Sequence, residues 1–213
     1  MPEMPEPRRV YGQDRLSAPG ATSSSNAWKV AGASVCGTSH AKSGIGCQDS
    51  HWTLTLPGDV LLAAVADGAG SAARSELGAA IAARTAVEEL ERRRRRGTGW
   101  PDTKEAWAAV MRGALDAARE AVEQAADVEG LAPRELASTL IVLLAMPDLI
   151  VAAQVGDGAA VMADAAGVVT ALTTPQIGEF LNETTFLVSP RATRSTRSSP
   201  RRALPSAPTT TSR

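Results

Sequence analysis

Short apolar runs and longer helical patterns alternate along the middle of this 213-residue chain. HWTLTL, residues 51–56, alternates apolar and polar positions, which is typical of a half-buried strand. The apolar run VLLAAVA, residues 60–66, follows the turn Pro57-Gly58-Asp59, and the two runs together predict a β-hairpin. WKVAGASVCG, residues 28–37, is a further expected strand.

Two helices are expected after this hairpin. The pattern SELGAAIAARTAVEELERRRRR begins at Ser75 and stops at Gly97, and a second helix is expected over about residues 103–126, with Gly130 after it. The five arginines Arg92–Arg96 close the first helix. Because cations suit the negative end of a helix dipole, we interpret them as a solvated helix end rather than as an interaction patch.

Four short apolar or alternating runs follow the helices: ASTLIVLLAM, LIVAAQVG, AAVMADAAG and VVTALTT. Turn residues separate them, which predicts consecutive antiparallel strands. Strands, two helices and strands again indicate an α+β fold in which the helices cover one face of a sheet or sandwich.

The chain length fits one compact domain, which we expect over residues 27–188. Residues 1–26 carry several prolines and no sustained period, so they predict a disordered lead-in. Residues 189–213 are rich in Arg, Ser, Pro and Thr and contain only Leu204 as a large aliphatic residue. Such a composition predicts a disordered tail.

The net charge of -1 hides an asymmetry. Six of the 22 Lys and Arg residues lie in residues 189–213, where there is no acid, so residues 1–188 hold 16 basic and 23 acidic residues. This acidic body offers no general nucleic-acid surface, and nucleic-acid binding stays an alternative only for the basic tail. No segment approaches the roughly 18–20 apolar residues of a membrane span, and the first residues lack the apolar core of a secretory signal. We therefore expect a cytoplasmic protein without a membrane partner.

Every Cys and His of the chain lies in one short window: Cys36, His40, Cys47 and His51. This spacing does not match the usual structural zinc patterns, in which close ligand pairs come together. A small buried thiol or a surface imidazole in a strand needs no metal, so we favour that interpretation over a zinc site.

Three aspartates stand at the tips of predicted strands: Asp49 before the first strand of the hairpin, Asp67 after the second, and Asp157 in the turn VGDGAA. Each alone is typical of a turn or a cap. Together they indicate a site for a hard cation such as Mg²⁺ or Mn²⁺, with the backbone carbonyl of Gly68 as a further oxygen ligand. A phosphate-binding glycine loop and a nucleophilic serine elbow are not indicated, because their motifs are absent.

The ordered set of motifs resembles the metal-dependent type 2C serine/threonine protein phosphatases, in a bacterial branch of the family. The motifs are GTSHAKSGIGCQDS, VADGAGS before a helix, ELASTLIVLL, VGDGAAVM and TTPQIGEFLNETTF. The resemblance implies a β-sandwich flanked by antiparallel helix pairs, with two Mg²⁺ or Mn²⁺ ions at one end. It also implies hydrolysis of phosphoserine and phosphothreonine in a phosphoprotein substrate by a metal-activated water.

Carried over by position, Asp67 would bridge both ions, Gly68 would give its carbonyl and Asp49 would hold a metal-bound water. Asp157 would stand near a further, weaker ion. Asp67 and Asp49 are therefore the expected catalytic residues.

The chain departs from the family pattern at several positions. Gly44 replaces the arginine that usually contacts the substrate phosphate, and Lys42 or His40 is the expected substitute. Gln48 replaces a carboxylate, and Ala69 stands where many relatives have His.

The family continues with further strands and two more metal-ligating aspartates, which this chain lacks. We expect a domain without its last strands. Either a truncation or frame shift at about Ser189 or a genuine tail explains the change in composition. The rival to an enzyme is a catalytically silent module that binds a phosphoprotein or another partner.

Overall fold

The computed structural model describes residues 28–37, 46–97, 99–175, 184–189 and 199–202. Five strands form an antiparallel sheet in the order β1-β2-β3-β4-β7, and two further strands, β5 and β6, pair separately. The strands are β1 Ser50–Leu56, β2 Val60–Ala66, β3 Leu140–Met146, β4 Leu149–Val155, β5 Val161–Ala163, β6 Val169–Ala171 and β7 Ser199–Arg202. The helices are α2 Ser75–Arg95 and α3 Lys104–Glu129, followed by the 3₁₀ turn η1 Pro133–Leu136.

The hairpin of β1 and β2 forms as predicted. Gly58 and Asp59 adopt positive φ angles of 84° and 55°, which such a tight turn favours for glycine and aspartate. Ser50 pairs with Ala66 at the other end of the hairpin. The residue before β1 and the residue after β2 therefore lie at the same end of the sheet.

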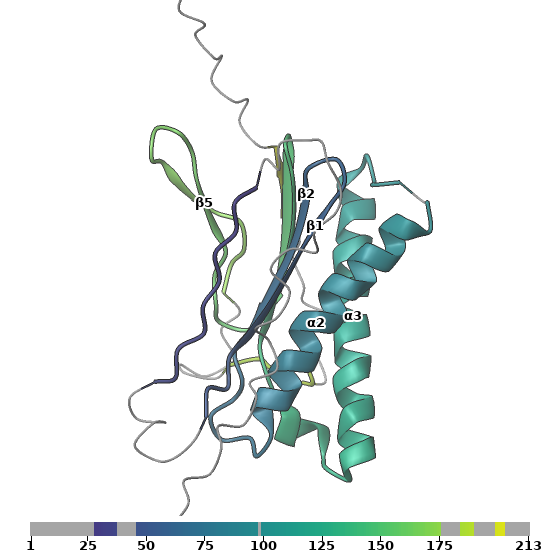
Figure 1. The fold of residues 1–213 in the computed structure, drawn as a ribbon, viewed down its shortest axis with the longest axis vertical. Coiled ribbons are helices and arrows are strands. Elements are labelled where there is room, and N and C mark those ends of the chain that lie inside the picture. Colours follow the sequence, from purple (N-terminus) through teal and green to yellow (C-terminus); the bar gives the residue numbers. More distant parts are fainter. Residues whose placement is uncertain (1–27, 38–45, 98, 176–183, 190–198, 203–213) are drawn as a thin grey trace, which may run out of the picture.

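Both predicted helices cover one face of the five-stranded sheet (Figure 1). Along β2, every second side chain points toward the helices. Val60, Leu62, Ala64 and Ala66 are buried in this way, while the residues between them are more exposed. They join the apolar sides of α2 and α3 in one core. Burying this apolar face is the main force that holds the helices on the sheet.

Caps fix both ends of α3. The Thr103 hydroxyl accepts a hydrogen bond of 3.2 Å from the Ala106 amide, and Gly130 ends the helix in the left-handed conformation with φ 67°. The helix runs three residues beyond its predicted end, to Glu129, because Gly130 rather than the preceding pattern stops it.

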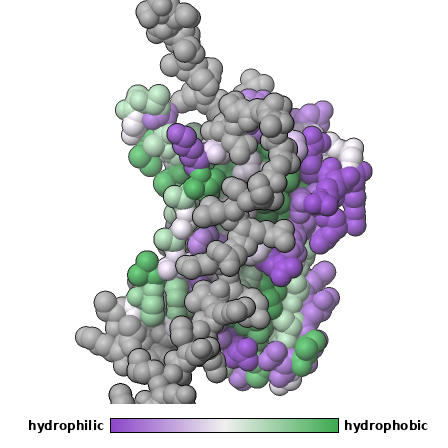
Figure 2. Space-filling view, viewed as in Figure 1, coloured by the Kyte–Doolittle hydropathy of each residue, from purple (hydrophilic) through white to green (hydrophobic). Residues whose placement is uncertain are grey.

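Ion pairs within α2 support the interpretation of its terminal arginines as a solvated helix end. Arg92 pairs with Glu89, and Arg95 pairs with Glu91 at 2.6 Å. Figure 2 shows hydrophilic residues gathered over the helical side of the molecule, where these pairs lie.

The second face of the sheet carries a smaller apolar cluster, in which Ile150, Ala152 and Leu172 are buried. The β5–β6 hairpin and the segment 28–37 lie over this face (Figure 1). Apolar side chains stay exposed on the hairpin, among them Val161 at 61%, and Figure 2 shows this apolar surface. The mixed fold with an antiparallel sheet and helices on one face is thus confirmed.

The structure corrects two expectations. Residues 28–37 are extended but form no strand, so that prediction is wrong. In the predicted tail, Ser199–Arg202 forms β7 and pairs with β4, so these four residues are part of the sheet. Residues 1–27, 190–198 and 203–213, on which the remaining disorder predictions fall, lie outside the described residues. Within the described ranges, no helix has both the length and the apolar character to cross a membrane.

Candidate functional site

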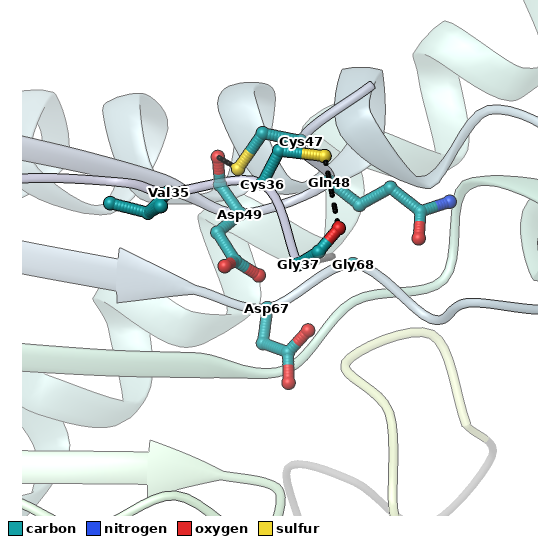
Figure 3. Close-up of a pocket in the computed structure, with 8 residues that line it drawn as sticks. All are labelled: Val35, Cys36, Gly37, Cys47, Gln48, Asp49, Asp67 and Gly68. Carbon is teal, nitrogen blue, oxygen red and sulfur yellow. Dashed lines mark hydrogen bonds between the residues drawn. The ribbon is translucent and has the colours of Figure 1, made fainter. Parts of the chain in front are cut away.

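A pocket of about 280 Å³ opens at the end of the sheet where β1 begins and β2 ends (Figure 3). Three segments meet in it, one before the sheet, one leading into β1 and one leaving β2. Its lining residues are Val35, Cys36, Gly37, Cys47, Gln48, Asp49, Asp67 and Gly68. The structure therefore brings together two of the three predicted aspartates and the predicted glycine.

Asp67 lies one residue beyond β2, and its backbone continues the pairing of β2 with β3. Gly68 forms an isolated antiparallel bridge with Ser138. The Ala69 amide donates a hydrogen bond of 2.9 Å to the Ala137 carbonyl. These contacts hold the backbone that carries Asp67 while its carboxylate remains exposed at the pocket.

Gly68 lets the segments of Asp49 and Asp67 approach closely. A Cβ atom at position 68 would lie 2.6 Å from the carbonyl oxygen of Gln48 and 2.9 Å from Cβ of Ser75. Only glycine avoids both contacts. The absence of a side chain at Gly68 thus allows the two aspartate-bearing segments to line one pocket.

The pocket offers oxygen ligands of the right kind for a hard divalent cation, but few of them. The Asp49 and Asp67 carboxylates and the Gly68 carbonyl are oxygen ligands of the kind that Mg²⁺ and Mn²⁺ prefer, with water completing the coordination. Counting only the residues that the structure describes, no group of three or more His, Cys, Asp or Glu side chains is placed to hold a metal ion. The pocket therefore offers an open site with few protein ligands.

Gln48 does not extend this donor set. Its side chain is 8% exposed and its Oε1 has no hydrogen-bond partner among the described residues. In Figure 3 its amide extends away from the two carboxylates. Gln48 therefore lines the pocket without turning its amide toward the two carboxylates.

Two of the residues of the zinc alternative, Cys36 and Cys47, line the pocket, and His51 does not. The thiol of Cys36 donates to the Gly37 carbonyl at 3.6 Å, and that of Cys47 to the Asp49 carbonyl at 4.0 Å. His51 instead contacts the segment 28–37, where its Nδ1 lies 3.2 Å from the Ser34 hydroxyl. His40 lies outside the described residues.

Asp157 lies at the same end of the sheet but does not line this pocket. β2 and β4 both end here, separated by β3, so the two strand ends are about 10 Å apart at the usual strand spacing. The Asp157 carboxylate accepts a hydrogen bond of 3.0 Å from the Thr184 hydroxyl. Its role near a further ion stays a prediction.

The predicted phosphate contacts, Lys42 and His40, lie outside the described residues. Thr139, which no motif singled out as functional, contacts the backbone of Asp67 through its side chain. A threonine just before an apolar strand is typical of any sheet. No local signal in the sequence distinguishes it, because its place opposite the end of β2 depends on the pairing of β2 with β3.

The sequence matches one protein family over most of its length. The profile of the family described as protein phosphatase 2C matches residues 36–206. The chain is 31% identical over 166 residues to serine/threonine-protein phosphatase 3 of Escherichia coli (strain K12), a match that covers 75% of this chain and 62% of that protein. The chain therefore belongs to the protein phosphatase 2C family.

Two solved structures show the same fold. The serine/threonine phosphatase Stp1 from Staphylococcus aureus matches with a TM-score of 0.51 and 15% identity, over 73% of this chain and 65% of that one. A bacterial serine phosphatase matches with a TM-score of 0.51 and 14% identity, over 73% of this chain and 67% of that one. The chain spans about 62% of the length of the Escherichia coli relative.

Proposed function

We propose that this chain is the domain of a metal-dependent protein phosphatase that hydrolyses phosphoserine and phosphothreonine. The observation that carries the proposal is the convergence of Asp49, Asp67 and the Gly68 carbonyl on one pocket, in a chain of the protein phosphatase 2C family. The matched relative carries a serine/threonine-phosphatase name, which supports the same activity.

The chain's own residues have distinct tasks in this proposal. Asp67 would bind Mg²⁺ or Mn²⁺ through its carboxylate, Gly68 would add its carbonyl, and Asp49 would hold a metal-bound water. When bound, such ions lower the pKa of a coordinated water and neutralise phosphoryl oxygens. Asp157 serves a further, weaker ion, and Lys42 or His40 contacts the substrate phosphate.

Hydrolysis of p-nitrophenyl phosphate and of a phosphothreonine peptide in the presence of Mn²⁺ tests the proposal. We expect Asp67→Asn to lose at least about 100-fold in rate, because misplaced reacting groups have effects of this size. Asp148→Asn is the matched control, since Asp148 lies in the exposed turn between β3 and β4, at the opposite end of the sheet. Equal activity of Asp67→Asn and the wild type would contradict the proposal.

A silent binding module is the second candidate. The small number of carboxylates favours it, because only Asp49 and Asp67 supply carboxylates among the lining residues and the described part of the chain forms no group of three or more side chains that could hold a metal ion. For this candidate we expect no turnover in the wild type, together with retained binding of the phosphothreonine peptide by calorimetry. Turnover that Asp67→Asn abolishes excludes it.

A further inference from the structure

Thr139 occupies a central position at the end of the sheet that carries the aspartates. It stands just before β3, which lies between β2 and β4. Asp67 directly follows β2, and Asp157 follows β4 after one intervening residue. Thr139 therefore lies between these two strand ends. Its side chain is 6% exposed.

One side of Thr139 holds the backbone of Asp67. The Asp67 amide donates a hydrogen bond of 3.1 Å to the Thr139 hydroxyl, and the Thr139 amide donates one of 2.8 Å to the Asp67 carbonyl. Both backbone polar groups of Asp67 are therefore bound to the same residue. Because the Cα–Cβ direction follows from the backbone, these two bonds also fix the direction in which the Asp67 side chain leaves the chain.

The other side of Thr139 packs on Gly156, the residue before Asp157. A Cβ atom built on Gly156 would lie 2.6 Å from Cγ2 and 2.7 Å from Cβ of Thr139. Gly156 has a φ of 113°, a conformation that residues with side chains rarely adopt. The threonine methyl group thus lies where it limits movement of the turn that carries Asp157.

We infer that Thr139 is a positioning residue for the cation site through its hydroxyl, which holds Asp67, while its methyl group only packs against the turn of Asp157. The inference rests on the proposed function, because it assigns Thr139 an effect on metal affinity. Residues that orient a ligand usually change metal affinity about 10- to 100-fold when they are replaced. A purely structural threonine would change stability without selective loss of metal binding.

Two substitutions separate the two sides of the residue. Thr139→Val keeps the branched shape but removes the acceptor for the Asp67 amide, and Thr139→Ser keeps the acceptor but removes the methyl group. Thr173→Val is the matched control, since the buried Thr173 hydroxyl accepts a hydrogen bond of 2.9 Å from the Ala160 amide, at the β5–β6 hairpin. It removes the same kind of bond between two residues that do not line the pocket.

Calorimetric titration of the full chain with Mn²⁺ gives the first measurement. We expect Thr139→Val to bind Mn²⁺ at least about tenfold more weakly than the wild type, and Thr139→Ser and Thr173→Val to stay within about threefold of it. Equal affinity of Thr139→Val and the wild type overturns the inference. An equal loss in Thr173→Val also overturns it, because the effect would then be general loosening.

Amide hydrogen exchange in the metal-free chain gives a second, independent measurement. We expect the Asp67 amide to exchange at least about tenfold faster in Thr139→Val than in the wild type, and protection to return in Thr139→Ser. Unchanged exchange in Thr139→Val overturns the inference whether or not the chain binds Mn²⁺. Absence of Mn²⁺ binding in the wild type, in contrast, overturns the proposed function, so the two failures are distinguishable.

Discussion

Gly78 in α2 lies against the backbone of Leu136 in η1, so closely that a Cβ atom on Gly78 would be 1.9 Å from the Leu136 carbonyl oxygen. We therefore expect Gly78→Ala to lower the free energy of unfolding by about 3 kcal/mol, the upper end of the usual effect of overpacking. Backbone cannot move aside as a flexible side chain does. Urea denaturation followed by circular dichroism measures the change.

Gly113 provides the control for this substitution. It lies exposed inside α3, and a Cβ atom there would meet nothing within 4 Å. We expect Gly113→Ala to raise the free energy of unfolding by about 0.5–1 kcal/mol, because alanine loses less backbone entropy in a helix. A loss of stability in both variants would contradict the assignment of the Gly78 effect to contact with Leu136.

Local sequence signals predicted most of the fold. The turn Pro57-Gly58-Asp59 fixed the hairpin, and its register placed Asp49 and Asp67 at one end of the sheet. The prediction of a strand over residues 28–37 was wrong, because alternation predicts an extended backbone but not a partner for its hydrogen bonds. β7 was missed for the converse reason, since an Arg-rich segment with a proline gives no strand signal although it pairs with β4.

The candidate site was predictable only in part. Asp49 and Asp67 stand out because each carboxylate borders an apolar strand. Thr139 does not stand out, because its contact with Asp67 spans 72 residues and depends on the pairing of β2 with β3. Long-range pairing of this kind follows from the packed sheet and not from any local pattern.

Gly68→Ala should weaken binding of Mn²⁺ at least about tenfold, because the new Cβ atom would press on the Gln48 carbonyl and displace the neighbouring Asp49. Calorimetric titration measures the affinity. Gly46→Ala is the control, since a Cβ atom there would meet nothing within 4 Å. If both variants bind Mn²⁺ equally well, the close approach at Gly68 has no role in the site.

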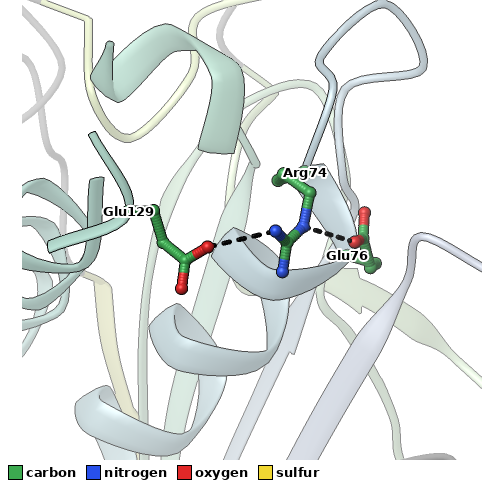
Figure 4. Close-up of polar contacts among 3 residues, drawn as sticks. All are labelled: Arg74, Glu76 and Glu129. Carbon is green, nitrogen blue, oxygen red and sulfur yellow. Dashed lines mark hydrogen bonds and ion pairs between the residues drawn. The ribbon is translucent and has the colours of Figure 1, made fainter. Parts of the chain in front are cut away.

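The Arg74 guanidinium lies between two carboxylates, 3.2 Å from Glu76 and 3.1 Å from Glu129, and so links the start of α2 to the end of α3 (Figure 4). The Arg74 and Glu129 side chains are both more than 40% exposed. We therefore expect a coupling energy of about 1 kcal/mol or less in a double-mutant cycle with Arg74→Ala and Glu129→Ala, decreasing at high salt. Urea denaturation at low and high NaCl provides the measurement, and a larger, salt-independent value would contradict this expectation.

Leu187 anchors the short described segment 184–189. Its side chain is fully buried, and its amide donates a hydrogen bond of 2.8 Å to the Ser138 carbonyl. We expect Leu187→Ala to lower the free energy of unfolding by about 2–4 kcal/mol, since it leaves a cavity in the core. Thermal unfolding detects the loss as a lower midpoint temperature.

Val128→Ala is the comparison for Leu187. The Val128 side chain is 87% exposed, so we expect a change within about 0.5 kcal/mol. Similar effects of both substitutions would show that residue 187 does not contribute to the core in solution.

The position of α2 separates two charged regions of the molecule. The helix starts at Ser75, which lies against Gly68, spans 21 residues and ends among the arginines. At the usual rise per residue, this length is about 30 Å. Because the Debye length is about 8 Å at physiological ionic strength, the arginine charges are largely screened at the opposite end of the helix. An anion that approaches the aspartates therefore experiences their local field, and anions that gather at the arginines do not compete for the same position.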